Sequence, residues 1–345
     1  MTLAARQSKE SSPLRVEPAT LRASVIMPTH DRRQLLEKAL NCLSRQTVDM
    51  SAIEVVVVAD GCSDGTLDML RFSRWPFALR VLQQSQQGVA ASRNAAAAAA
   101  QSLVLIFLDD DMMAASDFIE RHLAAHEKGD ADVVIGQLAP ASLPGVPGWW
   151  RWLESQLKEQ YCQMLQGQRR VDGLCLYSGN CSMRREVFQR IGGFNEKLAH
   201  SEDVELGMRL ERSGVIFRFA PDATAEHWGY CSYERWREMA YRYGRWDAGL
   251  VFNREHPSAL ARLRDNYASR GRLRQRYLSA ALKGGQRYPL TATALRLLGW
   301  TTGVLRLSLL ERRFYAAIYD LTYWKGVVDE LGGLRPIALS ARRAA

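Results

Sequence analysis

The sequence lacks any apolar run suited to crossing a membrane, and its start lacks the apolar core of a signal peptide. Residues 1–22 are polar and mixed in charge, so we expect a mobile leader there rather than an export signal. The nearest candidate span, Leu290–Leu310, is interrupted by Arg296 and Arg306, which would be costly inside a bilayer. We therefore expect a cytoplasmic protein in which this segment forms amphipathic helices, either packed on the core or lying on a membrane surface.

Cysteine pairs, internal repeats and an excess of acidic residues are also missing. The six cysteines are scattered without a C-x-x-C pair, which is typical of free thiols in a reducing cytosol. The net charge of +9 favours anionic partners, such as nucleotide diphosphates or acidic lipid surfaces, although solubility alone would explain it equally well. With 345 residues, the chain can bury one large core or two modest ones. We expect a main domain over 23–250 and a basic, amphipathic helical extension over 251–345.

Strand and helix patterns alternate through the first half of the chain. The expected strands are Ser24–Met27, Glu54–Ala59, Leu79–Leu82, Leu103–Leu108 and Asp132–Gly136, with helices over Arg33–Arg45, Gly88–Ala100 and Ser116–Lys128. This repeated pattern predicts an α/β fold with a mainly parallel sheet flanked by helices. Ligands of such sheets bind at the carboxyl ends of the strands. The polar clusters Thr29–Asp31, Asp60–Asp64 and Asp109–Asp111 each follow a strand, so we expect them on one edge.

The second half is less regular. Pro140–Trp152 is rich in Pro, Gly and Trp and is predicted to be a long loop. Helices are expected over Met183–Ile191, Asp203–Arg212 and Tyr233–Gly249, with a strand over Val215–Phe219.

The triple aspartate Asp109–Asp111 is the strongest chemical signal. Like carboxylates in one turn repel each other unless a cation or protons neutralise them. A hard divalent cation prefers oxygen ligands and can bridge carboxylate to phosphate. The competing interpretation is an aspartate-capped turn leading into a helix.

The other polar signals are weaker when taken singly. Asp60 could accept hydrogen bonds from a base or ribose, or serve only the turn. Gly88 opens a helix whose start could face an anion, with Arg93 pairing a phosphate or a carboxylate; a simple helix-start glycine is the alternative. Asp203 stands where acids are favoured at helix starts, and a lone histidine such as His227 is usually structural.

The order of these pieces resembles the large family-2 glycosyltransferases, which have the glycosyltransferase-A fold. The resemblance covers Ala23 to Gly249, so that 23–250 would be the catalytic domain. The pieces are Val25–Arg32, Val58–Thr66, Gly88–Asn94, Phe107–Asp111, Gly192–Phe194 and Ser201–Leu206. Six weak pieces in the right order make a strong signal together.

The resemblance implies a role for each candidate residue. Pro28, Thr29, Asp31, Asp60, Gly88, Arg93, Asp109 and Asp110 would bind the nucleotide-sugar; Asp109, Asp111 and His227 would hold Mn²⁺ or Mg²⁺; and Asp203 would be the catalytic base, beside Glu202. The donor expected is a UDP-sugar, transferred with inversion. Ala59, Cys62 and Asp31 depart from the residues common in the family, which leaves the nucleotide open. The acceptor would be a carbohydrate, a lipid-linked or a small molecule, in contact with Trp149, Trp150, Asn180 and Trp228.

Two other functions are open. A sugar-phosphate nucleotidyltransferase could use a similar sheet and metal, but no glycine-rich loop bearing Lys or Arg follows the first strand. A non-catalytic nucleotide-sugar or carbohydrate-binding protein would bind without transfer. We expect no nucleic-acid partner, and a location in the cytoplasm, either free or peripheral on the inner face of the membrane.

Overall fold

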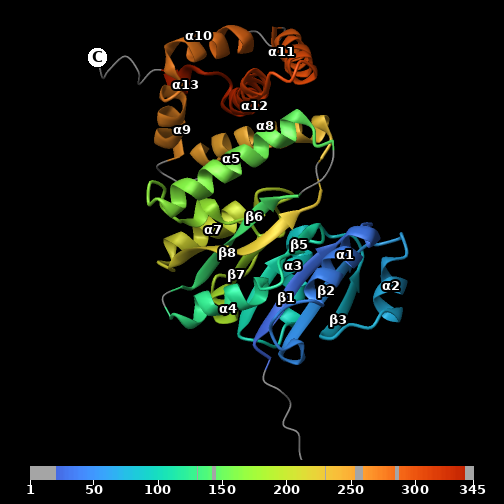
Figure 1. Cartoon of the computed structure of the whole chain (residues 1–345). Helices are drawn as coiled ribbons and strands as arrows, with labels where there is room; N and C mark the ends of the chain where they lie inside the picture. The colour runs from blue at the N-terminus through green and yellow to red at the C-terminus, as the bar shows by residue number, and fades with distance from the viewer. Residues whose placement is uncertain are drawn as a thin grey trace, which may run out of the picture.

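The structure, a computed structural model, describes residues 21–129, 131–141, 145–229, 231–252, 259–283 and 287–338. The predicted leader lies outside this part of the chain except for its last two residues. Figure 1 shows a sheet with helices on both of its faces, and beyond them a layer made of helices alone. The first part holds the candidate site, and the second packs against one end of it.

The sheet has eight strands in the order β3-β2-β1-β4-β7-β6-β8-β5. They are β1 (Ala23–Thr29), β2 (Ile53–Asp60), β3 (Ala78–Gln84), β4 (Val104–Leu108), β5 (Met112–Ala114), β6 (Val133–Pro140), β7 (Asn180–Arg184) and β8 (Phe217–His227). The first four strands in the chain pair in parallel, whereas β7 runs antiparallel to β4 and β6, and β5 runs antiparallel to β8. The expected sheet is therefore present, but it is mixed beyond β4.

Helices cover both faces because successive strand residues point to opposite sides. The helices that flank the sheet are α1 (Arg33–Leu43), α2 (Thr66–Phe72), α3 (Val89–Ala99), α4 (Phe118–Glu127), α5 (Gly148–Leu165), α6 (Arg185–Arg190) and α7 (Glu202–Arg212). Val55 and Val57 of β2 pack with α1, α2 and α4, whereas Val56 and Val58 pack with α3, α6 and α7. The uninterrupted apolar run of β2 thus belongs to a strand buried on both faces.

The three polar clusters lie on one edge of the sheet, as the strand pattern predicts. Thr29 pairs with Ala59 at the ends of β1 and β2. The Thr29 hydroxyl donates to Asp110 over 2.7 Å, and the Ser63 amide donates to Asp31 over 2.6 Å. The parallel register thus brings together side chains that are far apart in the sequence.

Three predicted elements differ from the structure in their bounds. The expected loop over Pro140–Trp152 ends in α5, so the tryptophans lie on a helix. The expected helix over Met183–Ile191 begins two residues too early, because Met183 and Arg184 end β7 and the helix itself is α6. The expected strand over Val215–Phe219 is β8, which continues through Pro221 to His227 beyond a register shift opposite Gly136.

The remaining helices form the C-terminal layer. They are α8 (Tyr233–Gly249), α9 (Ala259–Ala268), α10 (Gly271–Leu282), α11 (Arg287–Val304), α12 (Ser308–Leu331) and α13 (Arg335–Ala338). Helices α8 and α12 touch at their backbones: a Cβ added to Gly244 would lie 1.9 Å from the Tyr323 carbonyl oxygen. The boundary at 250 stays a prediction, although α8 before it packs with the helices after it. Among the described residues, no helix is long and apolar enough to span a membrane.

Candidate active site at the carboxyl edge of the sheet

Two arginines neutralise the triple aspartate. Arg32 lies at the start of α1 and donates to Asp110 over 3.0 Å and to Asp111 over 2.7 Å. Arg93, buried in α3, donates to Asp109 over 2.6 Å. Since carboxylates this close repel each other, these cations favour the charged forms. Burial is nevertheless the larger effect on Asp110 and raises its pKa to about 6.

Arg93 also joins the triple aspartate to the start of α7. Its second nitrogen donates to Glu202 over 2.9 Å, so one guanidinium holds carboxylates from two distant segments. The Arg93 side chain is 4% exposed. Burial alone would lower its pKa, but Asp109 and Glu202 outweigh burial and raise it. The sequence offered phosphate or carboxylate as partners for Arg93, and in this structure the partner is carboxylate.

Asp111 and His227 form a pair suited to a metal ion. The Asp111 carboxylate oxygen lies 3.5 Å from His227 Nε2. Two ligands on adjacent sites of one octahedral ion are about 3 Å apart, so this spacing fits. Burial pushes the pKa of Asp111 upward, but the hydrogen bond and charge of His227, together with Arg32, bring it below its ordinary value.

Two glycines leave space beside one oxygen of Asp111 and one oxygen of Asp109. A Cβ added to Gly229 would lie 3.0 Å from an Asp111 oxygen, and one added to Gly179 would lie 2.9 Å from an Asp109 oxygen. Carboxylate and imidazole donors are what Mn²⁺ and Mg²⁺ accept. The residues present therefore fit a divalent cation, with Asp109 set further back on Arg93.

A second acidic group follows the ends of β1 and β2. Ligand atoms of Asp31, Cys62 and Asp64 all lie within 4.8 Å of one another. Both carboxylates are exposed and accept hydrogen bonds from local amides: Asp31 from Ser63, and Asp64 from Arg33 and Thr66. The hydrogen bonds of these carboxylates account for the cluster as turn chemistry.

Asp203 opens onto a cavity of about 650 Å³ beside this edge. His227 and Trp150 share the cavity wall, and the Trp150 ring lies 5.3 Å from the His227 ring. Burial, followed by the charge of Glu202, raises the pKa of Asp203 well above its ordinary value. A carboxyl group of this kind is suited to exchanging a proton near neutral pH.

The residues assigned to nucleotide binding surround the ends of β1 and β2. Asp60 is buried and accepts hydrogen bonds from the backbone amides of Gln87 and Gly88, each over 2.8 Å. It therefore fixes the loop before α3. Gly88 has a φ of +94°, which a side chain would disfavour. Contacts of Pro28, Thr29, Asp31 and Asp60 with a nucleotide stay predictions.

Of the four predicted acceptor contacts, only Trp150 lines the cavity that contains Asp203. Trp149 turns toward Tyr233 and Tyr315, and Trp228 lies against Lys38.

The predicted acceptor contact of Asn180 has no support in this structure. Asn180 is fully buried; its amide donates to the carbonyls of Gln137 and Ala223, and its oxygen pairs with His122. These bonds use its polar atoms to join β7 to its neighbours, so none is left to meet an acceptor.

Several residues of the site carry no clear sequence signal. Tyr177, Tyr243 and Tyr319 line the cavity with Asp203, and Tyr319 comes from α12 in the predicted extension. Arg32, which pairs with Asp110 and Asp111, differs from these tyrosines. It directly follows Asp31 in the sequence, so its place at this edge of the sheet was predictable.

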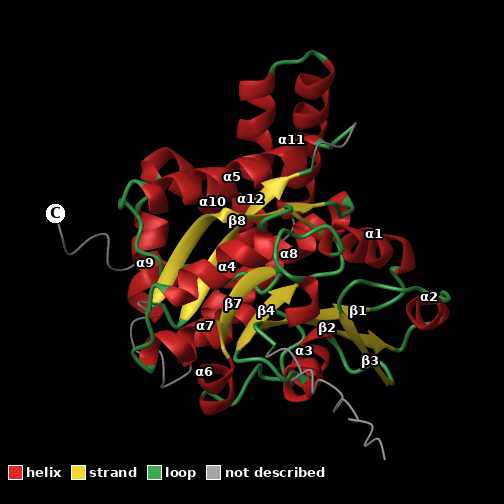
Figure 2. Cartoon of the chain, turned by 60° about the horizontal axis from the view of Figure 1, so that its bottom comes forward, coloured by secondary structure: helices red, strands yellow, loops and turns green. Residues whose placement is uncertain are grey.

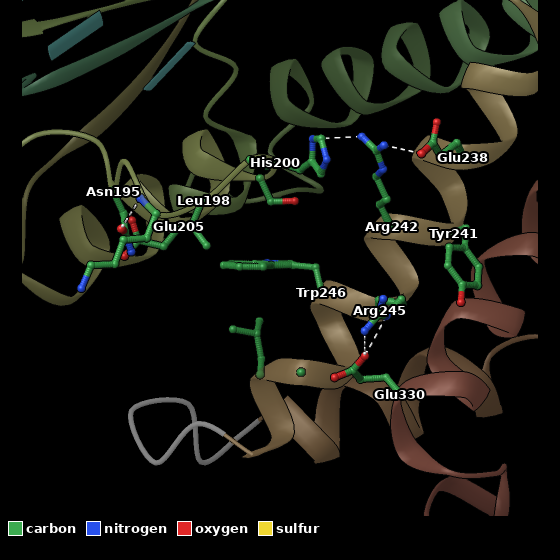
Figure 3. A pocket seen from close by; sticks show the side chains of 15 residues that line it. Asn195, Leu198, His200, Glu205, Glu238, Tyr241, Arg242, Arg245, Trp246 and Glu330 are labelled. Carbon is green, nitrogen blue, oxygen red and sulfur yellow. Dashed lines mark hydrogen bonds and ion pairs between the residues drawn. The ribbon is translucent and has the colours of Figure 1, made fainter. Parts of the chain in front are cut away.

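A larger cavity, of about 740 Å³, lies between α8 and the loop that leads to α7 (Figure 3). Trp246 lies within it, and several of the charged groups of the cavity are paired with each other. Arg242 contacts His200 and Glu238, and Arg245 contacts Glu330.

Comparison with known proteins agrees with this geometry. Residues 24–192 match the family model described as Glycosyl transferase family 2. Over this segment the chain resembles a family-2 glycosyltransferase domain. It is 29% identical over 272 residues to validoxylamine A glucosyltransferase of Streptomyces hygroscopicus subsp. jinggangensis, a match covering 70% of this chain and 62% of that protein. The chain thus spans less than two thirds of the length of this relative.

Solved structures share the fold of the family-2 domain. The mannosyltransferase PcManGT from Pyrobaculum calidifontis, in complex with GDP-Man and Mn²⁺, superposes with a TM-score of 0.61 at 18% identity, covering 93% of this chain and 90% of that chain. TarS of S. aureus, in complex with UDP-GlcNAc, superposes with a TM-score of 0.52 at 19% identity, covering 91% and 93%. The predicted glycosyltransferase-A architecture, with its helical C-terminal part, is confirmed.

Proposed function

We propose that the chain transfers a sugar from a nucleotide-diphospho-sugar to an acceptor hydroxyl, with a divalent cation and with inversion at the anomeric carbon. The observation that carries the proposal is the cavity shared by Asp203 and His227. It unites a carboxyl group of raised pKa with one member of a metal-binding pair. The relative in Streptomyces is named a glucosyltransferase, and the solved neighbours are complexes with nucleotide-sugars; both support the same reaction class.

In this proposal Asp203 accepts the proton of the acceptor hydroxyl as that oxygen attacks the anomeric carbon. Asp109, Asp111 and His227 would hold Mn²⁺ or Mg²⁺, which when bound would supply Lewis-acid stabilisation of the diphosphate leaving group. The Arg93 guanidinium donates to both Asp109 and Glu202. It therefore links a proposed metal ligand to the residue that precedes the proposed base, Asp203. Trp150 offers an aromatic wall for the acceptor.

A UDP-sugar is the donor we expect, with GDP-sugars the nearest alternative, because the two solved neighbours hold UDP-GlcNAc and GDP-Man. The departures at Ala59, Cys62 and Asp31 are consistent with either nucleotide. The acceptor class is a carbohydrate, a lipid-linked or a small molecule, and the reaction would take place in the cytoplasm.

Replacing the base separates transfer from binding. Asp203→Asn should nearly abolish transfer while leaving nucleotide-sugar affinity within about three-fold of wild type, since Asn keeps the size but accepts no proton. Asp68→Asn, at an exposed position in α2, is the matched control and should keep full activity. Unchanged turnover in Asp203→Asn would contradict the assignment of Asp203 as the general base.

Donor and metal are identified by binding. A thermal-shift panel of UDP-, GDP-, dTDP- and CDP-sugars with Mn²⁺ should show one preferred nucleotide, because a ligand raises the melting temperature according to its affinity. Calorimetry of Asp111→Ala with and without Mn²⁺ should show donor binding that no longer responds to the metal.

Release of pyrophosphate from a nucleoside triphosphate and a sugar phosphate would favour the nucleotidyltransferase instead. Metal-dependent binding without hydrolysis or transfer would favour a binding protein.

A further inference from the structure

The helices α11 and α12 form a hairpin that stands away from the rest of the molecule. Figure 2 shows it projecting beside the label α11. The two helices pack through small residues: a Cβ added to Gly299 would lie 3.3 Å from Tyr315, and one added to Gly303 would lie 2.6 Å from Glu311. The inner side of the hairpin is therefore filled, and its larger apolar side chains point outward.

Exposed apolar side chains concentrate on this hairpin. Of the sixteen large hydrophobic residues exposed in the described part of the chain, nine fall between 290 and 310. These nine are Leu290, Leu297, Leu298, Trp300, Val304, Leu305, Leu307, Leu309 and Leu310. A soluble monomer seldom exposes so many together, so the hairpin is a contact surface.

The shape of this surface favours a bilayer over a protein partner. Leu290, Leu297, Trp300 and Val304 repeat at helical spacing along α11, while Leu305 and Leu309 lie on either side of the turn between the helices. The apolar side chains thus surround the tip instead of forming one flat face, and lipid can enclose a tip on all sides. Neither helix of the hairpin is long and apolar enough to cross a membrane, so the tip would lie in the headgroup region of the bilayer.

The charges at the hairpin are complementary to anionic lipid. Arg306, Arg312 and Arg313 are exposed at its tip and along the first turns of α12. Glu311 is the one acid between 287 and 319, and it is buried in an ion pair with Arg151 over 2.8 Å. Basic residues beside an inserted apolar tip bind an anionic surface.

We propose that the tip of the α11–α12 hairpin, residues 297–313, docks the protein on an anionic membrane surface. The leucines and Trp300 enter the interface, and Arg306, Arg312 and Arg313 meet the lipid headgroups. Docking requires neither Asp203 nor a bound donor.

The hairpin also adjoins the candidate site. The Trp149 ring packs on Tyr315 of α12, and the next residue, Trp150, lines the cavity with Asp203. A docked hairpin would therefore place the α5 side of the cavity near the bilayer, which favours a lipid-linked acceptor. This consequence, unlike the docking, rests on the proposed function.

Co-sedimentation of the full chain with vesicles tests the docking. Phosphatidylcholine vesicles with and without phosphatidylglycerol are compared at low and high salt. The wild type should bind the anionic vesicles, and Leu305→Ser/Leu309→Ser should lower the partition coefficient about ten-fold or more. Arg312→Gln/Arg313→Gln should lose a similar factor on anionic vesicles only, and high salt should reproduce that loss. Asp203→Asn should bind like the wild type even when transfer is lost.

The matched control is Leu103→Ser/Leu273→Ser, which removes two leucines that are 73% and 83% exposed elsewhere. It should bind vesicles like the wild type. Absence of wild-type binding to anionic vesicles, or equal losses in the tip and control pairs, would overturn the proposal. A second copy covering the hairpin would also overturn it, and would appear in light scattering as a dimer that Leu305→Ser/Leu309→Ser splits.

Discussion

Removing the Arg93 guanidinium should destabilise the fold more than removing any surface arginine. Arg93→Met keeps the stem of the side chain and leaves Asp109 and Glu202 without their shared cation. Breaking a buried ion pair from one side costs about 3–5 kcal/mol. The Asp109 side chain is 30% exposed and can regain water, while that of Glu202 is 12% exposed, so we expect the lower end, about 3 kcal/mol.

This free energy can be read as a melting temperature. An unfolding entropy of about 2.1 cal/mol/K per residue gives roughly 0.7 kcal/mol/K for this chain, so about 3 kcal/mol lowers the melting temperature by about 4 °C. Differential scanning calorimetry at pH 8 measures it. Arg121→Met is the matched control, because Arg121 pairs only with Asp117 on the surface. An exposed pair contributes little to stability, so this variant should melt within about 1–2 °C of the wild type.

The pH dependence gives a second test of the same reasoning. Burial raises the pKa of Asp203, and the charge of Arg93 opposes that rise. Without Arg93, the folded variant therefore binds a proton on Asp203 more readily than the folded wild type does. Its stability relative to wild type therefore rises as the pH falls. The gap in melting temperature should be widest at pH 8 and should shrink toward pH 5. A difference in melting temperature below about 1 °C between wild type and Arg93→Met would refute this reasoning, and so would a difference that does not change with pH. Either result would mean that Arg93 is not the cation that neutralises these buried carboxylates.

Two further predictions concern the support beneath the site. Gly136→Ala would place a Cβ 2.1 Å from the Asn180 oxygen, so it should lower thermal stability by about 2–4 kcal/mol, whereas Gly249→Ala, with nothing within 4 Å, should change it little. Burial lowers the pKa of His122 and of His126 to about 4, below the unfolded value of 6.5. Each thus contributes stability above pH 6.5 that is lost as the pH falls toward 4, about 2 kcal/mol between pH 7 and pH 5. In urea unfolding, His122→Gln/His126→Gln should lose about 4 kcal/mol less than wild type over that interval; equal losses would contradict the assignment.

The fold was predictable wherever one local pattern had one structural solution. The apolar run of β2, followed by turn formers and then by α3, permits little besides a parallel unit. Motif order gave the candidate residues Asp111, Asp203 and His227, which the fold does bring to one end of the sheet. The sequence could assign them because each directly follows a strand or opens a helix, and those positions are fixed by topology.

What escaped prediction depended on contacts between distant segments. Asn180 carries a polar side chain near the site, and only the packing shows that His122 and two carbonyl groups use it fully. The tryptophans at 149–152 sit among Pro and Gly, which marks a loop locally, yet packing on Tyr233, Tyr315 and Trp236 holds them in a helix. Tertiary contacts override local propensity in both cases.

The two arginines are not equivalent partners for the triple aspartate. The Arg93 side chain is almost wholly buried. If Asp109 left Arg93 for another cation, the buried Arg93 charge would lose one of its two carboxylate partners. Arg32 is 43% exposed and can return to water while its carboxylates find another cation. Within the proposed function, an arriving divalent ion would therefore displace Arg32 from Asp111 at a small free-energy cost and leave Arg93 on Asp109. On this proposal Asp111 and His227 would be the first ligands of the ion. Asp109 would stay on Arg93, which also holds Glu202 next to the proposed base Asp203.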